Sequence, residues 1–115
     1  MGRKQTYIAE LGGTSLAAGT ATLLTNRLRP GQSLCIQLVA FRSDSEKNGV
    51  ANLGVLRGST LTRYATVLMG NQSQTYNDDS EIWLESDAQL QIDFTHVGAT
   101  CPIFAWVYGY LVDDH

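Results

Sequence analysis

Residues 88–95 alternate strictly between apolar and polar side chains, and this is the strongest constraint that the sequence places on the fold. The apolar members are Ala88, Leu90, Ile92 and Phe94. Because successive side chains of a β-strand point to opposite faces, a period of two predicts a strand with one buried and one wet face. Helical periodicity is nearly absent elsewhere, and glycine-rich and polar clusters recur at short intervals. The pattern favours an all-β chain.

The spacing of these clusters divides the chain into eight expected strands. They cover residues 3–10, 20–28, 33–42, 50–56, 60–69, 81–85, 88–95 and 103–112, with the longest polar loop at 70–80. The connections are too short for βαβ crossovers, and 115 residues fit one domain. The sequence therefore predicts a single-domain, antiparallel eight-stranded jelly-roll-like β-sandwich over residues 1–115. We expect residues 1–5 to form an extended N-terminal arm and residues 113–115 an acidic C-terminal tail.

The last expected strand is apolar on both faces. Ile103, Ala105 and Val107 share one face with Gly109 and Leu111, whereas the other face is aromatic throughout. A strand in a two-sheet sandwich buries only one face inside the sandwich. The aromatic face is thus expected to be covered by a loop of the same chain or by another subunit.

Charge is distributed unevenly along the chain. All eight basic residues lie at or before position 63, where there are only three acidic residues, so this part has a net charge of +5. The part after position 63 has eight acidic residues and no Lys or Arg, so its net charge is −8. Two interpretations stay open. The two parts interleave in the sandwich and neutralise each other, or the two signs lie on different faces and order identical subunits side by side.

No set of residues typical of catalysis or cofactor binding stands out. The two histidines, His96 and His115, are too few for a catalytic triad or a multi-histidine metal site, and Asn77-Asp78-Asp79 lacks the ligand spacing of a calcium loop. We expect no catalytic residue, metal, cofactor or small-molecule substrate. Nucleic acid and membrane are not expected as partners, because basic residues do not cluster and no apolar run approaches the ~20 residues that cross a bilayer. The polar start predicts a protein made and used without export.

Cys35 and Cys101 lie in strand-like surroundings and lack the spacing of a zinc site. Two reduced, buried, structural thiols are the favoured interpretation. One disulfide or an intermolecular contact is the alternative.

The order of features resembles small jelly-roll structural proteins of tailed phages, most closely capsid decoration (cement) proteins. The likeness lies in residues 28–36 (LRPGQSLCI), the mid-chain polar loop, residues 86–92 (SDAQLQI) and residues 107–112 (VYGYLV). The resemblance implies a non-enzymatic virion protein that is made in the host cytoplasm. Such a protein binds the major capsid protein on the capsid surface and stabilises the shell, often as a homotrimer. It also implies subunit contacts through aromatic side chains and a basic arm: Arg3, Lys4, Tyr7, Trp83, Phe104, Trp106, Tyr108 and Tyr110.

Two alternatives remain at this stage. A tail, fibre or head-to-tail component of a phage would share the fold. A carbohydrate-binding module would stack a sugar on an aromatic platform beside polar ligands, and the residues suited to this are Tyr76, Asn77, Asp78, Asp79 and Trp83.

Overall fold

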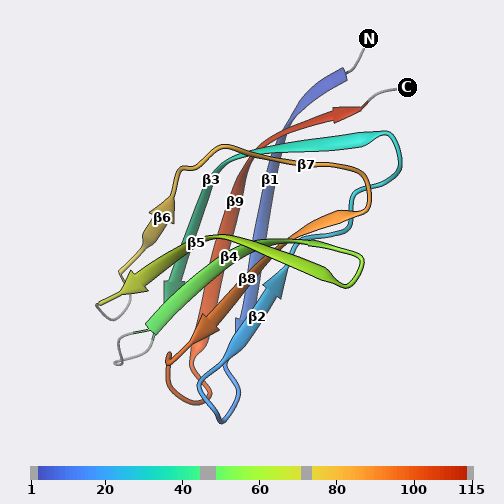
Figure 1. Cartoon of the computed structure of the whole chain (residues 1–115). Coiled ribbons are helices and arrows are strands. Elements are labelled where there is room, and N and C mark those ends of the chain that lie inside the picture. Colours follow the sequence, from blue (N-terminus) through green and yellow to red (C-terminus); the bar gives the residue numbers. More distant parts are fainter. Residues whose placement is uncertain (1–2, 45–48, 71–73, 114–115) are drawn as a thin grey trace.

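The computed structural model describes residues 3–44, 49–70 and 74–113, which form nine strands and no helix. Two sheets face each other, and the first and last strands run side by side (Figure 1). The strands are β1 (Arg3–Thr14), β2 (Ala21–Leu24), β3 (Gln32–Ser43), β4 (Gly49–Arg57), β5 (Thr60–Met69), β6 (Tyr76–Asp78), β7 (Ile82–Leu84), β8 (Ala88–Thr95) and β9 (Pro102–Asp113).

The strand order is that of a jelly roll. Sheet A has the order β1-β9-β3, with β6 and β7 both paired to β3, and sheet B has the order β2-β8-β4-β5. Every pairing is antiparallel. The predicted antiparallel jelly-roll-like sandwich is confirmed, and the count is nine instead of eight because two short strands, β6 and β7, share the place of one along β3.

The strand missing from the prediction is β6, which lies within the stretch expected to be the longest polar loop. Its three residues pair with Val39–Phe41 of β3. A segment this short cannot display a period of two, so its sequence looks like a loop. The half-buried ring of Tyr76 packs against the core and holds this edge to the sheet.

Strand β1 is longer than expected because Gly12 and Gly13, assigned to a loop, continue its pairing with β9. Strand β2 is shorter than expected. Beyond its end, the Thr25 hydroxyl accepts a hydrogen bond from the Leu90 amide at 2.9 Å, so a side chain takes over from the regular backbone ladder. The segment still follows β8, because the Leu28 amide donates to the Ala88 carbonyl at 3.2 Å.

The core lies between the two sheets. In β8 buried and half-buried residues alternate without a break, which confirms the strand that the sequence marks most clearly. Phe41 of sheet A meets Phe94 of sheet B edge to face, with ring centroids 6.2 Å apart. Burying these large side chains together is the main favourable contribution to folding.

The ends of the described chain are part of the sheet. Residues 3–5 belong to β1, and Asp113 pairs with Arg3 on one side and Gln32 on the other. The expected arm is therefore wrong for residues 3–5 and the expected tail is wrong for Asp113. The rest of both, residues 1–2 and 114–115, lies outside the described residues.

The basic and acidic parts of the chain interleave. Arg27 contacts Asp87 at 3.6 Å and Arg63 contacts Asp93 at 3.2 Å, so these two ion pairs each join a residue of the basic part to one of the acidic part, whereas Arg42 and Asp44 pair within the basic part. This arrangement follows from the topology, which places β8 and β9 between strands from the first half. It fits the interpretation in which the two parts neutralise each other.

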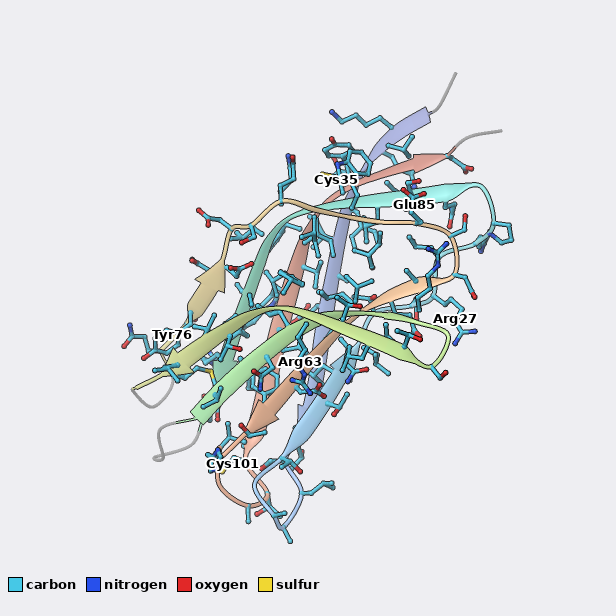
Figure 2. The ribbon with its side chains drawn as sticks, viewed as in Figure 1. Arg27, Cys35, Arg63, Tyr76, Glu85 and Cys101 are labelled. Atoms are coloured by element: carbon cyan, nitrogen blue, oxygen red, sulfur yellow. The ribbon has the colours of Figure 1, made fainter. Side chains whose placement is uncertain are left out.

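Both cysteines are free, as predicted, and they lie toward opposite ends of the sandwich (Figure 2). Cys35 is fully buried. Cys101 is only partly covered, so the prediction that both thiols are buried is wrong for Cys101. It precedes the first residue of β9, where the chain is still turning.

Candidate interaction surface

The outer face of sheet A carries a row of aromatic rings from β9. Phe104, Trp106, Tyr108 and Tyr110 form this aromatic stripe, and each is partly exposed, whereas Ile103, Ala105 and Val107, which alternate with them, are fully buried. Strand β9 lies between β1 and β3, so the stripe runs along the middle of its sheet. The structure thus confirms that the two faces of β9 differ as the sequence indicates.

At one end of the stripe, two rings lie against each other and under a cation. Phe104 and Trp106 are stacked with centroids 6.4 Å apart and planes 17° apart. The Arg42 guanidinium lies 4.8 Å from the Phe104 centroid and 6.0 Å from that of Trp106, and its Nε is 3.3 Å from a carboxylate oxygen of Asp44. On the other side, Gly12 is paired with Phe104, and the lack of a side chain there leaves the ring uncrowded.

At the other end, rings and charges from four segments meet. Trp83 of β7 packs edge-on against Tyr110, with centroids 5.6 Å apart, and Lys4 Nζ lies 4.0 Å from the Tyr110 centroid. Beneath them the Cys35 thiol donates to a carboxylate oxygen of Glu81 at 3.5 Å. A hydrogen bond with Cys35 raises the pKa of Tyr110, and burial raises the pKa of the Cys35 thiol. This end is preorganised by contacts within the chain, yet Trp83 keeps 49% of its surface exposed.

Between the two ends the sheet is hollowed. A groove of about 390 Å³ is lined by Thr6, Ile8, Gln37 and Tyr108 together with the ends of Lys4 and Tyr110. The pairing of β3 with β9 shifts register between Ile36 and Leu38, so Gln37 is the extra residue of a β-bulge. A Cβ at Gly109 would collide with the carbonyl oxygen of Cys35, so only glycine fits opposite the bulge.

Six of the eight interface candidates share this face. Lys4, Trp83 and the four rings of the stripe are brought together there, as described above. Tyr7 is not among them: it points to the inner side of sheet A and packs against the core, where burial raises its pKa. Its neighbour Ile8 points outward instead and is 65% exposed. Arg3 occupies the first position of β1, and its side chain lies outside the described part of the chain.

Ile8 and Arg42 are surface residues that sequence reasoning missed. The alternation within residues 3–10 separates Ile8 from Tyr7, but it does not say which of the two faces the core. Arg42 can be recognised as a residue of this surface only when the register between β3 and β9 is known, because that register places Arg42 opposite Phe104. The missing signal in both cases is the register between strands far apart in the sequence.

The structure does not bring the carbohydrate-site candidates together. Tyr76 lies opposite Phe41 on the inner side, and its hydroxyl accepts a hydrogen bond from the Gly70 amide at 2.8 Å. Trp83 lies opposite Cys35, six positions away along β3 or about 20 Å, and on the outer side. Asp78 accepts hydrogen bonds from Ser80, while Asn77 and Asp79 are exposed. An aromatic platform flanked by these polar side chains is absent from this part of the described structure.

A second groove opens on the side of the sandwich where β5 and β7 approach each other. It measures about 610 Å³ and is lined mainly by Val55, Tyr64, Ile82 and Trp83, with Arg57 at its rim. Burial strongly raises the pKa of the Tyr64 hydroxyl. The groove is continuous with the aromatic stripe through Trp83, which borders both.

The described ranges hold neither a metal-ligating cluster nor a long apolar helix. They contain no group of three or more His, Cys, Asp or Glu side chains arranged to hold a metal ion. They also contain no helix of the length and hydrophobicity needed to cross a membrane.

Comparison with known proteins leaves the family open. No family model and no curated protein matches the chain. Among solved structures, the chain is similar to the Drosophila NLP core, whose structure concerns pentamer formation and histone binding. The two are 16% identical with a TM-score of 0.41, and the similar region includes 98% of this chain and 100% of the NLP core chain. It is also similar to chains of infectious bursal disease virus, strain Gx (11% identity, TM-score 0.38) and strain Gt (13%, 0.35). In both comparisons the similar region includes 96% of this chain, but only 31% and 32% of the Gx and Gt chains.

Proposed function

We propose that this chain is a non-enzymatic structural protein of a virion, and specifically a decoration protein on the capsid of a tailed phage. It is made in the host cytoplasm and binds the major capsid protein on the outer surface of the shell. The observation that carries the proposal is the aromatic stripe, four partly exposed rings aligned on the outer face of a rigid sheet.

The chemistry of the stripe suits protein binding. Tyr, Trp, Phe and Arg are enriched at the centres of protein interfaces and account for most strong contacts there. Phe104 and Trp106 already contact each other and Arg42, and Tyr110 contacts Trp83 and Lys4, so binding would immobilise few additional side chains at the two ends of the stripe. The matching surface of a capsid protein is apolar at its centre, with a carboxylate toward Lys4, because Arg42 is already paired with Asp44.

The homotrimer implied by the resemblance stays a prediction, and it competes with the dimer that is inferred below from the edge of sheet A. A tail, fibre or head-to-tail component would use the same stripe and differ only in its partner. The carbohydrate-binding alternative loses support, because Tyr76 and Trp83 lie on opposite sides of sheet A. Titration with mono- and oligosaccharides tests it directly, since a sugar stacked on Trp83 would change tryptophan fluorescence.

Cosedimentation with empty capsids of the phage whose genome encodes the chain tests the proposal. We expect the wild-type chain to bind the heads. Trp106→Ala should weaken binding by about 30-fold, the effect of losing a ~2 kcal/mol contact. Leu68→Ala is the matched control, because Leu68 is 74% exposed on the outer face of sheet B. Binding to tails alone, or equal binding by Trp106→Ala, would contradict the proposal.

A further inference from the structure

Strand β1 is a long edge strand. In the described structure it pairs along its whole length, Arg3–Thr14, with β9 and with no other strand. The backbone amides and carbonyls on its other side are therefore not used by sheet A. Such a row is a template for a further strand. Strand β2 of the facing sheet approaches β1 without pairing to it, and at the far end of β1 Leu23 lies 3.3 Å from the position that a Cβ of Gly13 would take.

The side chains along this edge are complementary to themselves. Lys4, Thr6, Ile8 and Glu10 point to the outer face, with Lys4 three positions before Tyr7 and Glu10 three positions after it. We propose that β1 pairs antiparallel with β1 of a second copy of this chain, with Tyr7 opposite Tyr7. In this register Lys4 of each copy lies directly opposite Glu10 of the other, so the twofold axis creates two cross-strand ion pairs.

The exposed Ile8 supports the same register. It is 65% exposed, so covering it in a contact between two copies would remove apolar surface from water. In the proposed pairing Ile8 lies opposite Thr6 of the second copy and diagonal to its Ile8, a separation at which cross-strand side chains touch. The two isoleucines therefore cover each other at the centre of the contact.

Neighbouring registers lose this complementarity. A shift that puts Thr6 opposite Thr6 places Lys4 opposite Ile8, and one that puts Ile8 opposite Ile8 places Lys4 opposite Gly12. A shift by a single residue would turn the two outer faces to opposite sides of the joined sheet. The Tyr7 register keeps both aromatic stripes on the same side. The inferred contact uses the edge of sheet A beside the stripe and shares Lys4 with it, but the argument for the pairing does not rest on the proposed function.

Charge reversal tests the pairing by size-exclusion chromatography with light scattering over a dilution series. The wild-type chain should be a dimer. Lys4→Glu and Glu10→Lys should each weaken dimerisation by about tenfold or more, because each creates two pairs of like charges. The double variant Lys4→Glu/Glu10→Lys should restore it. Arg57→Glu and Glu85→Lys make the same charge changes at exposed positions away from β1 and should have no effect. A monomer, a trimer or a double variant that stays dissociated would overturn the inference.

Disulfide trapping tests the register. In a Cys101→Ser background, which removes the partly covered native thiol, Thr6→Cys and Ile8→Cys chains are mixed under mild oxidation. Directly opposed residues in antiparallel strands are 4.5–5.5 Å apart at their Cα atoms, within the range that a disulfide spans. The mixture should form a crosslinked heterodimer faster than either chain forms a homodimer. Equal or slower rates in the mixture would overturn the Tyr7 register.

Discussion

The two outer faces of the sandwich share a fold but differ in chemistry. On sheet B, Asp93 accepts hydrogen bonds from Thr22 at 2.8 Å and from Gln91 at 2.8 Å, and contacts Arg63 at 3.2 Å. Arg63 lies across the middle of this sheet in Figure 2. On sheet A, aromatic rings and the cations above them occupy the equivalent positions. Sheet B satisfies the polar groups around Asp93 within the chain and exposes apolar side chains such as Leu68, whereas sheet A leaves a continuous row of aromatic rings partly in contact with water.

This difference separates the structural from the functional role of a strand's outer face. A network of hydroxyl, amide and carboxylate groups that is satisfied within the chain gains little from being covered by another protein. Exposed rings contribute favourably to the free energy only when another surface covers them and removes them from water. The comparison therefore predicts that changes on sheet B affect the stability of the chain, whereas changes on the aromatic stripe mainly affect its binding.

The largest expected effect tests the backbone that supports the stripe. Gly109→Ala should lower the free energy of unfolding by about 3 kcal/mol, because its Cβ would collide with the backbone of β3. Gly12→Ala is the control in the same sheet. Its Cβ would have 3.8 Å to the nearest atom, an ordinary contact, so we expect a change below about 0.5 kcal/mol. Urea unfolding followed by circular dichroism measures both, and similar losses for the two variants would contradict this assignment.

The next effect tests the polar face. Asp93→Ala removes the carboxylate that Thr22, Gln91 and Arg63 share and should cost about 1–2 kcal/mol of unfolding free energy. Asp79→Ala, at an exposed position in the connection between β6 and β7, should cost less than about 0.5 kcal/mol. Capsid binding should be unaffected by either change. If Asp93→Ala abolished capsid binding without unfolding the chain, sheet B would be the binding face.

A smaller effect appears at alkaline pH. Burial raises the pKa of Tyr64 in the folded chain above its ordinary value near 10, so the folded state disfavours the phenolate. The contribution of Tyr64 to the unfolding free energy is therefore complete below pH 10, and it falls above pH 10 as this tyrosine ionises in the unfolded chain. We expect the unfolding free energy to be about 1 kcal/mol lower at pH 11 than at pH 9. Tyr64→Phe should flatten this dependence in urea titrations at the two pH values, and an unchanged slope would contradict the assignment.

The last prediction concerns the rate at which the two thiols react with an alkylating reagent, and it involves the smallest change in stability. Cys101 should react with iodoacetamide at pH 8, whereas Cys35, buried and with a raised pKa, should react at least about 100-fold more slowly. Trp83 lies opposite Cys35 at the end of the stripe, so Trp83→Ala should speed the labelling of Cys35. Mass spectrometry of tryptic peptides measures both rates. A fast Cys35 in the wild-type chain would show that this end of the stripe is open.

Much of the fold was predictable because alternation along single strands is a local signal. The strand over residues 88–95 and the two-faced strand 103–112 follow from it directly. What failed depends on partners distant in the sequence. Gly12 and Gly13 look like a loop until β9 is known to pair with them, and β6 is too short to show a period. The sequence predicts Tyr7 and Tyr76 as surface candidates because an aromatic residue looks alike whichever face it occupies.

Both tryptophans of the chain, Trp83 and Trp106, lie on the outer face of sheet A, so tryptophan fluorescence reports on that face alone. Acrylamide quenching of the free chain and of the chain bound to empty capsids is the most direct test of the account. If the aromatic stripe binds the shell, the quenching constant should fall several-fold on binding. An unchanged quenching constant for a chain that cosediments with capsids would contradict the account, because the stripe would still be in water.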